Sequence, residues 1–376
     1  MGFRDTAGVY NEVVGDRFSV VSVHLRDPQC AVAETALVTL RAAVKRYATL
    51  ARPFTLLPPL LGIVSGAVCA WGSAHNPDPT RALTSSVILT VILGSVCAAF
   101  LNAANNALNQ IYDLEIDRIN KPNRPLVTGE ISIREAWVFT WIMYALGTLP
   151  TWLVVAYPYT TWQAKLTAPV GAHECFFIYL TALVATFVYS VPALGRTKAH
   201  AIGANLTIAI PRGCLLKVAG WTMVAHAFAS RRPFLASSEP WFIGSVFMFF
   251  LLGAASTKDF SDIEGDRAGN CRTLPIRYGV RRAAWMIAPF FVFPWLLIPL
   301  GASLDDPLSP GNRMLTGNAT FLTAFGVVLA LWGVYTVWLI VRNPDELTST
   351  ENHPSWRHMY LMMMAAQVGF AVAYVL

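Results

Sequence analysis

The sequence predicts an all-α protein, a polytopic membrane bundle of nine transmembrane helices around a central cavity. The first observation is composition: 55% of the 376 residues are hydrophobic and only 13% are charged, against roughly 25% charged residues in typical soluble domains. The second is a series of apolar segments of nearly equal length. The third is that no polar linker divides these segments, so one bundle is a simpler interpretation than two soluble domains.

The N-terminal residues 1–47 are predicted to form a cytosolic extension that is partly disordered. Acidic residues such as Glu12 and Asp27 occur throughout this stretch, and it lacks the apolar core of a signal peptide. The acidity also does not fit a transit peptide. Residues 31–47 are a candidate interfacial helix, and residues 48–376 are predicted to form the transmembrane domain.

Nine apolar segments follow the extension, each close to the roughly 20 residues that cross the hydrocarbon core of a bilayer. They are residues 54–72, 86–112, 136–156, 174–192, 201–224, 240–257, 284–300, 320–341 and 358–376. Several contain Gly or Pro, which membrane helices tolerate when neighbouring groups satisfy the backbone. We therefore expect one membrane span per segment.

The distribution of Lys and Arg predicts how the bundle is oriented. These residues concentrate in the N-terminal extension and in the loops after the second, fourth, sixth and eighth segments, whereas the opposite loops hold only Arg81, Lys165, Arg231, Arg232 and Arg313. Positive loops stay on the cytosolic side. We expect an N-terminus in the cytosol and, because nine is odd, a C-terminus on the other side. This topology accounts for the net charge of +6, so we expect no nucleic-acid partner.

A row of polar residues closes the second apolar segment. Asn109, Asp113 and Asp117 are spaced i, i+4 and i+8, so on a continuous helix they would share a face, with about 5–6 Å between successive Cβ atoms. Neighbouring carboxylates need cations. Ligands that are all oxygen suit Mg²⁺ held between carboxylates and substrate phosphates.

A second acidic row, from Lys258 to Asp266, follows the sixth apolar segment, and Asp262 and Asp266 are again spaced i, i+4. The alternative interpretation is that both rows are solvated helix ends that stabilise loops. Ionisable groups next to a membrane span are costly and usually functional. We therefore favour a metal–diphosphate site at one membrane surface, with both acidic rows on the cytosolic side.

The two rows also carry a family resemblance. The first reads Asn-x-x-x-Asp-x-x-x-Asp and is followed by Asn-Arg-Pro at 123–125, and the second reads Lys-Asp-x-x-Asp-x-x-Gly-Asp over 258–266. In this combination the chain resembles the UbiA superfamily of intramembrane prenyltransferases, from Arg52 to the C-terminus. Asn109-Gln110 in place of the commoner Asn-Asp, with residues 115–122 and 262–266, is most similar to the homogentisate-type branch.

The resemblance implies a function, which is Mg²⁺-dependent transfer of a prenyl group from its diphosphate to an acceptor. We expect the acceptor atom to be an aromatic ring carbon. Two Mg²⁺ ions are expected, one held by Asp113 and Asp117 and the other by Asp262 and Asp266. Asn109 would ligate through its amide or hold a metal-bound water. Such ions stabilise the leaving diphosphate, and a dry cavity protects the allylic cation. The expected partners are a prenyl diphosphate, a small aromatic or lipid acceptor, and the lipid bilayer.

Further site residues are predicted around the acidic rows. Arg124 belongs to the matched Arg-Pro element, and Tyr189 and Lys198 resemble the family's diphosphate-side Tyr and Lys. Arg52 matches an Arg-Pro pair at the start of the first span and would hold the acceptor or the diphosphate. The second row also supplies two predicted substrate-binding residues, Lys258 and Asp259. For the basic residues, the alternative is ordinary cytosolic loop charge.

Arg212 and Lys217 are unusual because both lie inside the fifth apolar segment. A cation within a membrane span normally faces a polar cavity or an acidic partner. One interpretation is that Arg212 and Lys217 line an acceptor pocket and bind an anionic aromatic molecule. The other is a structural pair with Glu174 or a side chain that reaches towards the membrane surface.

Two other functions remain open at the level of sequence. Some UbiA-type proteins resemble terpene cyclases, which would use the same acidic rows to ionise a diphosphate without an external acceptor. A transporter or lipid-binding scaffold is a third hypothesis, from a different class. The paired acidic rows at one face and the absence of carboxylates in the middle of the spans argue against it.

Overall fold

A computed structural model of the chain describes residues 28–228, 236–350 and 353–376. Residues 1–27, on which much of the expected disorder falls, lie outside the described residues. The chain divides into two compact units, residues 1–45 and 46–376. The described part of the first unit is helical and belongs to α1 (Pro28–Ala51), which includes the candidate interfacial helix. Residues 53–376, which form all the other elements, belong to the second unit.

Within the described residues, seven helical segments are long and apolar enough to cross a membrane. They are η1–α2 (Pro53–Gly72), α3 (Ser85–Tyr112), α9–η6–α10 (Ala201–Trp221), α11–η7 (Glu239–Thr257), α14–η8–α15 (Val280–Ser303), α16 (Ala319–Val341) and α18 (Pro354–Val375). The other two expected spans correspond to the shorter helices α6 (Ile133–Thr148) and α8 (Glu174–Ser190). The all-helical, multi-pass membrane fold is thus confirmed, whereas the count of nine spans stays a prediction.

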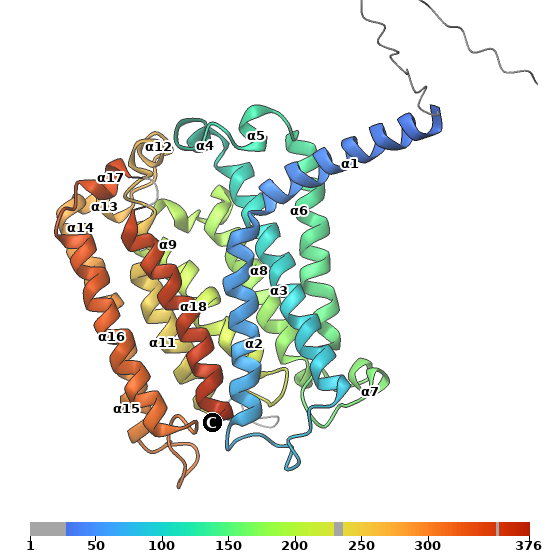
Figure 1. Ribbon diagram of the computed structural model, residues 1–376, viewed down its shortest axis with the longest axis vertical. Helices are drawn as coiled ribbons and strands as arrows, with labels where there is room; N and C mark the ends of the chain where they lie inside the picture. The colour runs from blue at the N-terminus through green and yellow to red at the C-terminus, as the bar shows by residue number, and fades with distance from the viewer. Residues whose placement is uncertain (1–27, 229–235, 351–352) are drawn as a thin grey trace, which may run out of the picture. The chain divides into compact units, whose positions relative to one another are not determined.

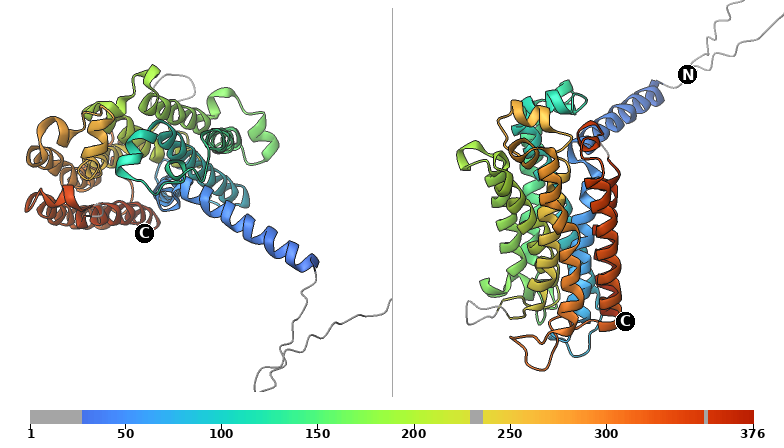
Figure 2. Two further views of the ribbon diagram at one scale, coloured as in Figure 1. Left: turned by 90° about the horizontal axis from the view of Figure 1, so that it is seen from above. Right: turned by 90° about the vertical axis from the view of Figure 1, so that its left-hand side faces the viewer.

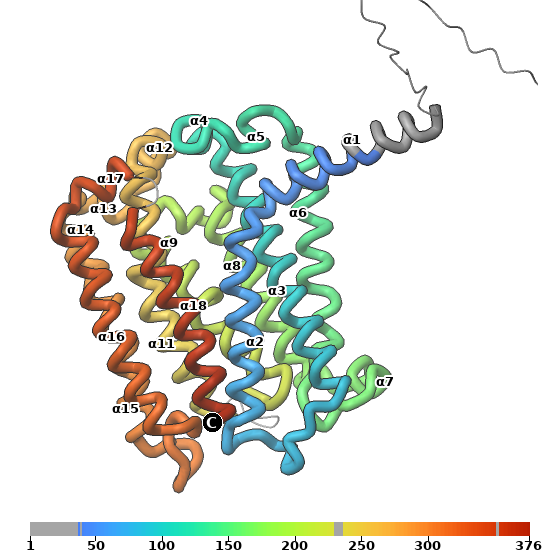
Figure 3. The backbone as a smooth tube through the Cα atoms, in the orientation of Figure 1, coloured from blue at the N-terminus to red at the C-terminus, as the bar shows by residue number. Residues whose placement is uncertain are grey.

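The long helices run side by side, and the short ones cluster at the two ends (Figure 1; Figure 3). One end carries α4 (Leu114–Asn120), α5 (Pro125–Thr128), α12 (Ile263–Ala268) and α13 (Leu274–Tyr278). We call it the motif end, because both acidic rows lie there. The other end carries α7 (Trp162–Leu166) and the C-terminus, as the second view in Figure 2 also shows for the C-terminus.

Close helix packing depends on small residues, as is typical of membrane bundles. α2 (Leu57–Gly72) crosses α10 (Leu216–Trp221) at Gly66 and Gly220. A Cβ atom on Gly220 would lie 2.3 Å from the carbonyl oxygen of Ile63, and one on Gly66 would lie 2.6 Å from that of Lys217. Neither position has room for a side chain, so this pair of glycines sets the distance between the two helices.

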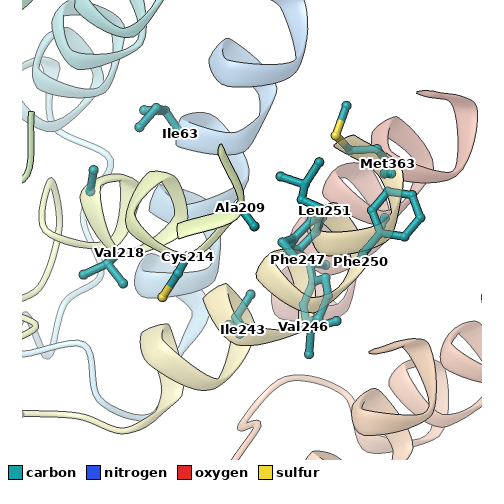
Figure 4. Packing of buried hydrophobic residues seen from close by; sticks show 14 of the residues in the cluster. Ile63, Ala209, Cys214, Val218, Ile243, Val246, Phe247, Phe250, Leu251 and Met363 are labelled. Carbon is teal, nitrogen blue, oxygen red and sulfur yellow. The ribbon is translucent and has the colours of Figure 1, made fainter. Parts of the chain in front are cut away.

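The buried core is apolar and is centred on α11 (Glu239–Ala254). Figure 4 shows Phe247 and Phe250 of α11 among side chains from α2, η6, α10 and α18. Phe250 also contacts Trp295, with 4.8 Å between the ring centroids. This core holds the helices around the cavity described next.

Several long helices begin at a capping side chain, which fixes where each span starts. The Thr84 hydroxyl accepts a hydrogen bond from the backbone N–H of Val87 at the start of α3, and the Asn318 amide oxygen does the same for α16. Ser132 and Glu135 form a reciprocal capping box at the start of α6. Such side chains satisfy N–H groups that a helix leaves without partners at its first turn.

Candidate active site

A cavity of about 560 Å³ opens among the helices of the second unit. It joins the motif end to the apolar interior, because both Asn109 and Ala98 of α3 line it. These two residues are eleven positions apart, which corresponds to roughly 16 Å along a helix that rises 1.5 Å per residue. All predicted site residues except Lys217 line this cavity, namely Arg52, Asn109, Asp113, Asp117, Arg124, Tyr189, Lys198, Arg212, Lys258, Asp259, Asp262 and Asp266.

The backbone at both acidic rows departs from one continuous helix. α3 ends at Tyr112 and α4 begins at Leu114, so the expectation that Asn109, Asp113 and Asp117 occupy one unbroken helix face is wrong. Asp113 between the two helices has φ −101° and ψ 13°, in the sparsely populated bridge region. Hydrogen bonds of the helical type nevertheless continue through the break, from Asp113 N–H to Asn109 and from Asp117 N–H to Asp113. The three residues therefore stay close together.

The carboxylates of the first row are buried and paired with cations from other parts of the chain. Asp113 is 2% exposed. It accepts hydrogen bonds from the ammonium of Lys198 and from Nη2 of Arg196, the latter at 3.3 Å. Asp117 is also buried and accepts from Nη1 of Arg124. Buried charges need such partners, because an unpaired carboxylate pays a large desolvation penalty.

The second row faces the same cavity with a higher density of negative charge. Burial raises the pKa of Asp266 to about 6; the Lys198 ammonium opposes this rise, and the Asp262 and Asp113 carboxylates add to it. Burial likewise raises the pKa of Asp259 well above its ordinary range, with Asp266 and Asp262 adding to the effect. Asp262 lies 3.5 Å from the ammonium of Lys121. A cation bound between the rows would relieve this repulsion.

Two arginines of the site, Arg52 in the cavity lining and Arg196 bonded to the cavity-lining Asp113, adopt backbone conformations that are rare for residues other than glycine. Arg52 has φ 54° and Arg196 has φ 37°, and such strain concentrates at functional sites. Burial lowers the pKa of Arg52 to about 10, with Arg124 adding to this effect and the two first-row carboxylates opposing it. Its Nη2 atom is buried and has no hydrogen-bond partner among the described residues. Arg52 is therefore a cation with a donor to spare for a bound anion.

Sequence reasoning identified Asn109 but missed three further asparagines on α3. Asn102, Asn105, Asn106 and Asn109 all line the cavity. Asn102 and Asn106 donate to the backbone of Thr55 and Ala51, which fixes the start of the first span beside Arg52. The Oδ1 atoms of Asn105 and Asn109 are buried without a hydrogen-bond partner among the described residues. The signal was present, since four amides recur at a spacing of three or four residues in an apolar segment.

The structure separates Arg212 from Lys217. Ile210–Leu215 forms a turn of π-helix that contains Pro211, and such turns often occur at functional sites. Arg212 on this turn lines the cavity, as predicted. Lys217 does not: its side chain is buried, and its ammonium lies 4.5 Å from the centre of the Phe247 ring and 6.0 Å from that of Phe370.

The alternative partner for these two cations is also excluded. The Glu174 carboxylate accepts hydrogen bonds from His226 and from the backbone N–H groups of Ala227 and Phe228. It therefore fixes a connecting loop. We do not retain Lys217 as an acceptor-binding residue.

An aromatic cluster that sequence reasoning also missed lines the cavity near Arg52 and Arg212. It consists of Phe54, Trp356 and Tyr360, with 4.6 Å between the ring centroids of Trp356 and Tyr360 and 5.4 Å between those of Phe54 and Tyr360. The ammonium of Lys258 lies 4.7 Å from the centre of the Trp356 ring. Trp356 and Tyr360 lie one turn apart at the start of α18, in a sequence that gave no motif.

The donor set fits Mg²⁺ bound together with a phosphate ligand. Among the described residues, no three His, Cys, Asp or Glu side chains converge as a complete protein-built metal site would require. Mg²⁺ differs from Zn²⁺ in this respect, because it keeps several waters and is commonly held by one or two carboxylates plus substrate phosphates. The five cavity-lining carboxylates of the two rows and the free Oδ1 of Asn109 are ligands of this kind.

The fold and this site define a class of protein, a helical membrane protein with two acidic motifs at one end of an internal cavity. Residues 56–362 match the UbiA prenyltransferase family. The chain belongs to this family, which confirms the resemblance drawn from the motifs.

Individual relatives agree with this assignment. The chloroplastic homogentisate solanesyltransferase of Arabidopsis thaliana is 32% identical over 281 residues, which are 75% of this chain and 66% of that enzyme. The digeranylgeranylglyceryl phosphate synthase of Methanosphaera stadtmanae is 25% identical over 286 residues, which are 75% of this chain and 87% of that enzyme. The chain thus spans about two thirds of the length of its plant relative.

A solved structure has a similar fold. The UbiA homolog from Archaeoglobus fulgidus, solved bound to GPP and Mg²⁺, superposes with a TM-score of 0.60 at 19% sequence identity. The match covers 88% of this chain and 100% of that one. At this level of identity the comparison establishes the fold.

Proposed function

We propose that this protein transfers a prenyl group from a prenyl diphosphate to an aromatic acceptor within the membrane, in a reaction that depends on Mg²⁺. One observation carries the proposal: two acidic rows, 149 residues apart from Asp113 to Asp262, meet at one end of a cavity that continues into the apolar interior. A prenyl diphosphate has the same polarity, with a multiply charged head and a hydrocarbon tail. The head fits the acidic rows with their cations, and the tail fits the apolar part.

In this proposal the carboxylates of both rows hold Mg²⁺, with Asp113 and Asp117 on one side and Asp262 and Asp266 on the other. Bound there, Mg²⁺ supplies positive charge that stabilises the leaving diphosphate. Asn109, with its buried and unpartnered Oδ1, would accept a hydrogen bond from a metal-bound water or act as a ligand.

The cations of the site act on the diphosphate directly. Lys198 and Arg124 are bonded to Asp113 and Asp117, and both can donate to phosphate oxygens once those carboxylates turn to a metal ion. The bond between C1 and the diphosphate oxygen breaks, and the diphosphate leaves with the electron pair. Donors placed where this charge develops lower the barrier. Tyr189 and Lys258 also line this part of the cavity.

The acceptor subsite is assigned to Arg52, Arg212 and the cluster of Phe54, Trp356 and Tyr360. The rings provide flat apolar surfaces for an aromatic ring, and the two guanidinium groups suit an anionic substituent. The acceptor's ring carbon forms the new bond to C1, and the ring proton leaves to the diphosphate or to water. A relative named as a homogentisate enzyme supports an aromatic acceptor, whereas the archaeal synthase points to a lipid acceptor.

We infer a topology of nine spans, with α6 and α8 as the two shorter ones. The N-terminal extension, residues 1–47, and the motif end face the cytosol, and the C-terminus lies on the other side. The excess of Lys and Arg at the motif end supports this orientation. Residues 48–376 form the enzyme domain in this proposal.

The test is product analysis with purified protein in lipid nanodiscs. Geranyl or geranylgeranyl diphosphate is supplied with Mg²⁺, with and without homogentisate, and both diphosphate release and organic products are measured. We expect a prenylated aromatic product that requires the acceptor and disappears in EDTA. A terpene hydrocarbon or alcohol formed without acceptor would instead identify a cyclase. Binding of the prenyl diphosphate without any diphosphate release would refute an enzyme.

A further inference from the structure

The two short helices that carry the last Asp of each acidic row, α4 and α12, are built alike. α4 begins after Asp113 and α12 begins after Asp262, and the backbone angles of these two residues nearly coincide, at φ −101°, ψ 13° and φ −105°, ψ 10°. The third and seventh positions after Asp113 are Ile116 and Asn120. The third and seventh positions after Asp262 are both glycine, Gly265 in α12 and Gly269 at its C-cap. The two helices also contact each other.

These third and seventh positions meet crosswise. A Cβ atom on Gly269, the seventh position after Asp262, would lie 2.4 Å from Cδ1 of Ile116. A Cβ atom on Gly265, the third position, would lie 2.5 Å from Nδ2 of Asn120. Each helix therefore packs its third position against the seventh position of the other, in an approximately two-fold arrangement. Gly265 is on α12 and Gly269 is its C-cap, whereas both larger side chains are on α4.

The contact at Asn120 is also a pair of hydrogen bonds. The Nδ2 amide of Asn120 donates to the backbone carbonyl oxygen of Asp262 at 3.0 Å, and the backbone N–H of Gly265 donates to Oδ1 of Asn120 at 3.0 Å. The second bond satisfies one of the N–H groups that the first turn of α12 leaves without an intrahelical partner. A single side chain on α4 thus holds the first turn of α12, where the second acidic row ends at Asp266.

We propose that Asn120 and Gly265 form a clasp that positions the two acidic rows for joint binding of Mg²⁺ and a diphosphate. Asn120 lies three residues after Asp117, and its two bonds end on the backbone of Asp262 and of Gly265, which precedes Asp266. The clasp therefore fixes the relative placement of carboxylates that must bind one ligand together. Asn120 is a positioning residue, since it acts through those carboxylates. This inference rests on the proposed function of the site.

The amide at this position has a specific chemical requirement. Asp in place of Asn would still accept from the Gly265 N–H, but its carboxylate would lie against the Asp262 carbonyl oxygen, where a donor is needed. Ala would remove both bonds and leave a space. Ala at Gly265 would push against the amide, whereas Ala at both positions would place a methyl group where the amide had been.

The test combines a structural readout with a binding readout. Nitroxide labels are placed through a non-natural amino acid at Glu115 and Glu264, which are exposed on α4 and α12, and the distance distribution between them is measured by pulsed electron spin resonance. Binding is measured as the heat-denaturation shift produced by inorganic diphosphate with increasing Mg²⁺. The variants are Asn120→Ala, Asn120→Asp, Gly265→Ala and Asn120→Ala/Gly265→Ala. The matched control in the unlabelled protein is Glu115→Gln, which changes an exposed carboxylate of α4 paired only with Arg118 among the described residues.

We expect a single narrow distance distribution in the wild type and a broader one in Asn120→Ala and Gly265→Ala. The Mg²⁺ concentration for half the shift should rise about tenfold in both, corresponding to roughly 1.4 kcal/mol. This Mg²⁺ concentration should also rise in Asn120→Asp and should stay unchanged in Glu115→Gln. The double variant should lose less Mg²⁺ affinity than the sum of the losses in the two single variants, since contacting residues are coupled.

Three results would overturn the inference. A narrow, unshifted distribution in Asn120→Ala would show that the amide does not fix the two helices. A broadened distribution with unchanged Mg²⁺ dependence would make the contact merely structural. A wild-type protein that shows no Mg²⁺-dependent response to diphosphate would refute the proposed function itself, and with it the role of the clasp.

Discussion

Replacing Lys198 by Met removes the cation that holds Asp113, and the structure allows its effect to be worked out. The Asp113 carboxylate is 2% exposed and is bonded to both Lys198 and Arg196. Burial alone would lower the pKa of Lys198, but Asp113, Tyr189 and Asp266 together outweigh this effect and the pKa is raised. Lys198 is therefore charged in the resting protein.

Breaking a buried ion pair by removing one partner costs about 3–5 kcal/mol. Arg196 remains at 3.3 Å from Asp113 in Lys198→Met, so we expect a loss of stability near the lower end of this range, about 3 kcal/mol. The catalytic effect has a separate cause. Loss of one preorganised donor to a developing anion costs roughly a hundredfold to a thousandfold in kcat, and we expect a fall of this size.

The assay is diphosphate release by wild type, Lys198→Met and Arg118→Met at saturating Mg²⁺, with the heat-denaturation midpoint measured alongside. Arg118 is a matched control, because it is an exposed cation on α4 whose partner, Glu115, is also exposed. We expect the control to retain wild-type kcat and stability. Turnover of Lys198→Met within threefold of the wild type would refute the assignment of Lys198 to the diphosphate.

Three further predictions address the acceptor, a buried lysine and the topology. Arg212→Met should raise the apparent KM of the aromatic acceptor about tenfold, or roughly 1.4 kcal/mol, with little change in the KM of the prenyl diphosphate. Lys217→Met should change neither KM. Equal effects of the two variants would contradict the assignment of Arg212 to the acceptor subsite. Burial lowers the pKa of Lys165 from 10.5 to about 8. Because the unfolded chain binds this proton more tightly, the stability of the folded protein should rise as the pH increases from about 8 towards 10.5. The denaturation midpoint of the wild type should rise over the same range, and an equal rise in Lys165→Met would show that Lys165 is not its cause. In intact cells, a cysteine at the exposed Asn123 should resist an impermeant thiol reagent and one at the exposed Asn318 should react; the reverse pattern would overturn the orientation.

The sequence was sufficient for the parts of the fold that follow from periodicity and segment length. Apolar segments of about 20 residues are long enough to cross a bilayer, and seven of the nine correspond to helices of that kind among the described residues. The other two overlap α6 and α8, which are shorter helices, because segment length in sequence does not fix where a helix ends. The break at Asp113 was not predictable either, since i, i+4 spacing is the same with or without it.

In the site, charge and motif spacing identified most of the charged residues that line the cavity, and three-dimensional pairing accounts for what was missed. Arg196 lies in the positively charged loop after the fourth apolar segment, which predicts only the orientation of the bundle, yet it is bonded to Asp113, 83 positions away in the sequence. Trp356 and Tyr360 belong to the last span, whose composition resembles that of any membrane helix. Lys217 was misplaced for a related reason: an unusual cation in a span signals a special environment, but five residues beyond Arg212 it lies on a different face of the helix, against Phe247.

The central claim is that two distant acidic rows form one Mg²⁺–diphosphate site, and diphosphate release by Asp113→Ala and Asp262→Ala tests it most directly. Each variant alters one row and leaves the other intact, and folding is checked by the denaturation midpoint. If the rows act together, each variant should lose about a thousandfold or more of its turnover, as expected when several kcal/mol of leaving-group stabilisation is removed. Near-normal release by either folded variant in saturating Mg²⁺ would contradict the claim.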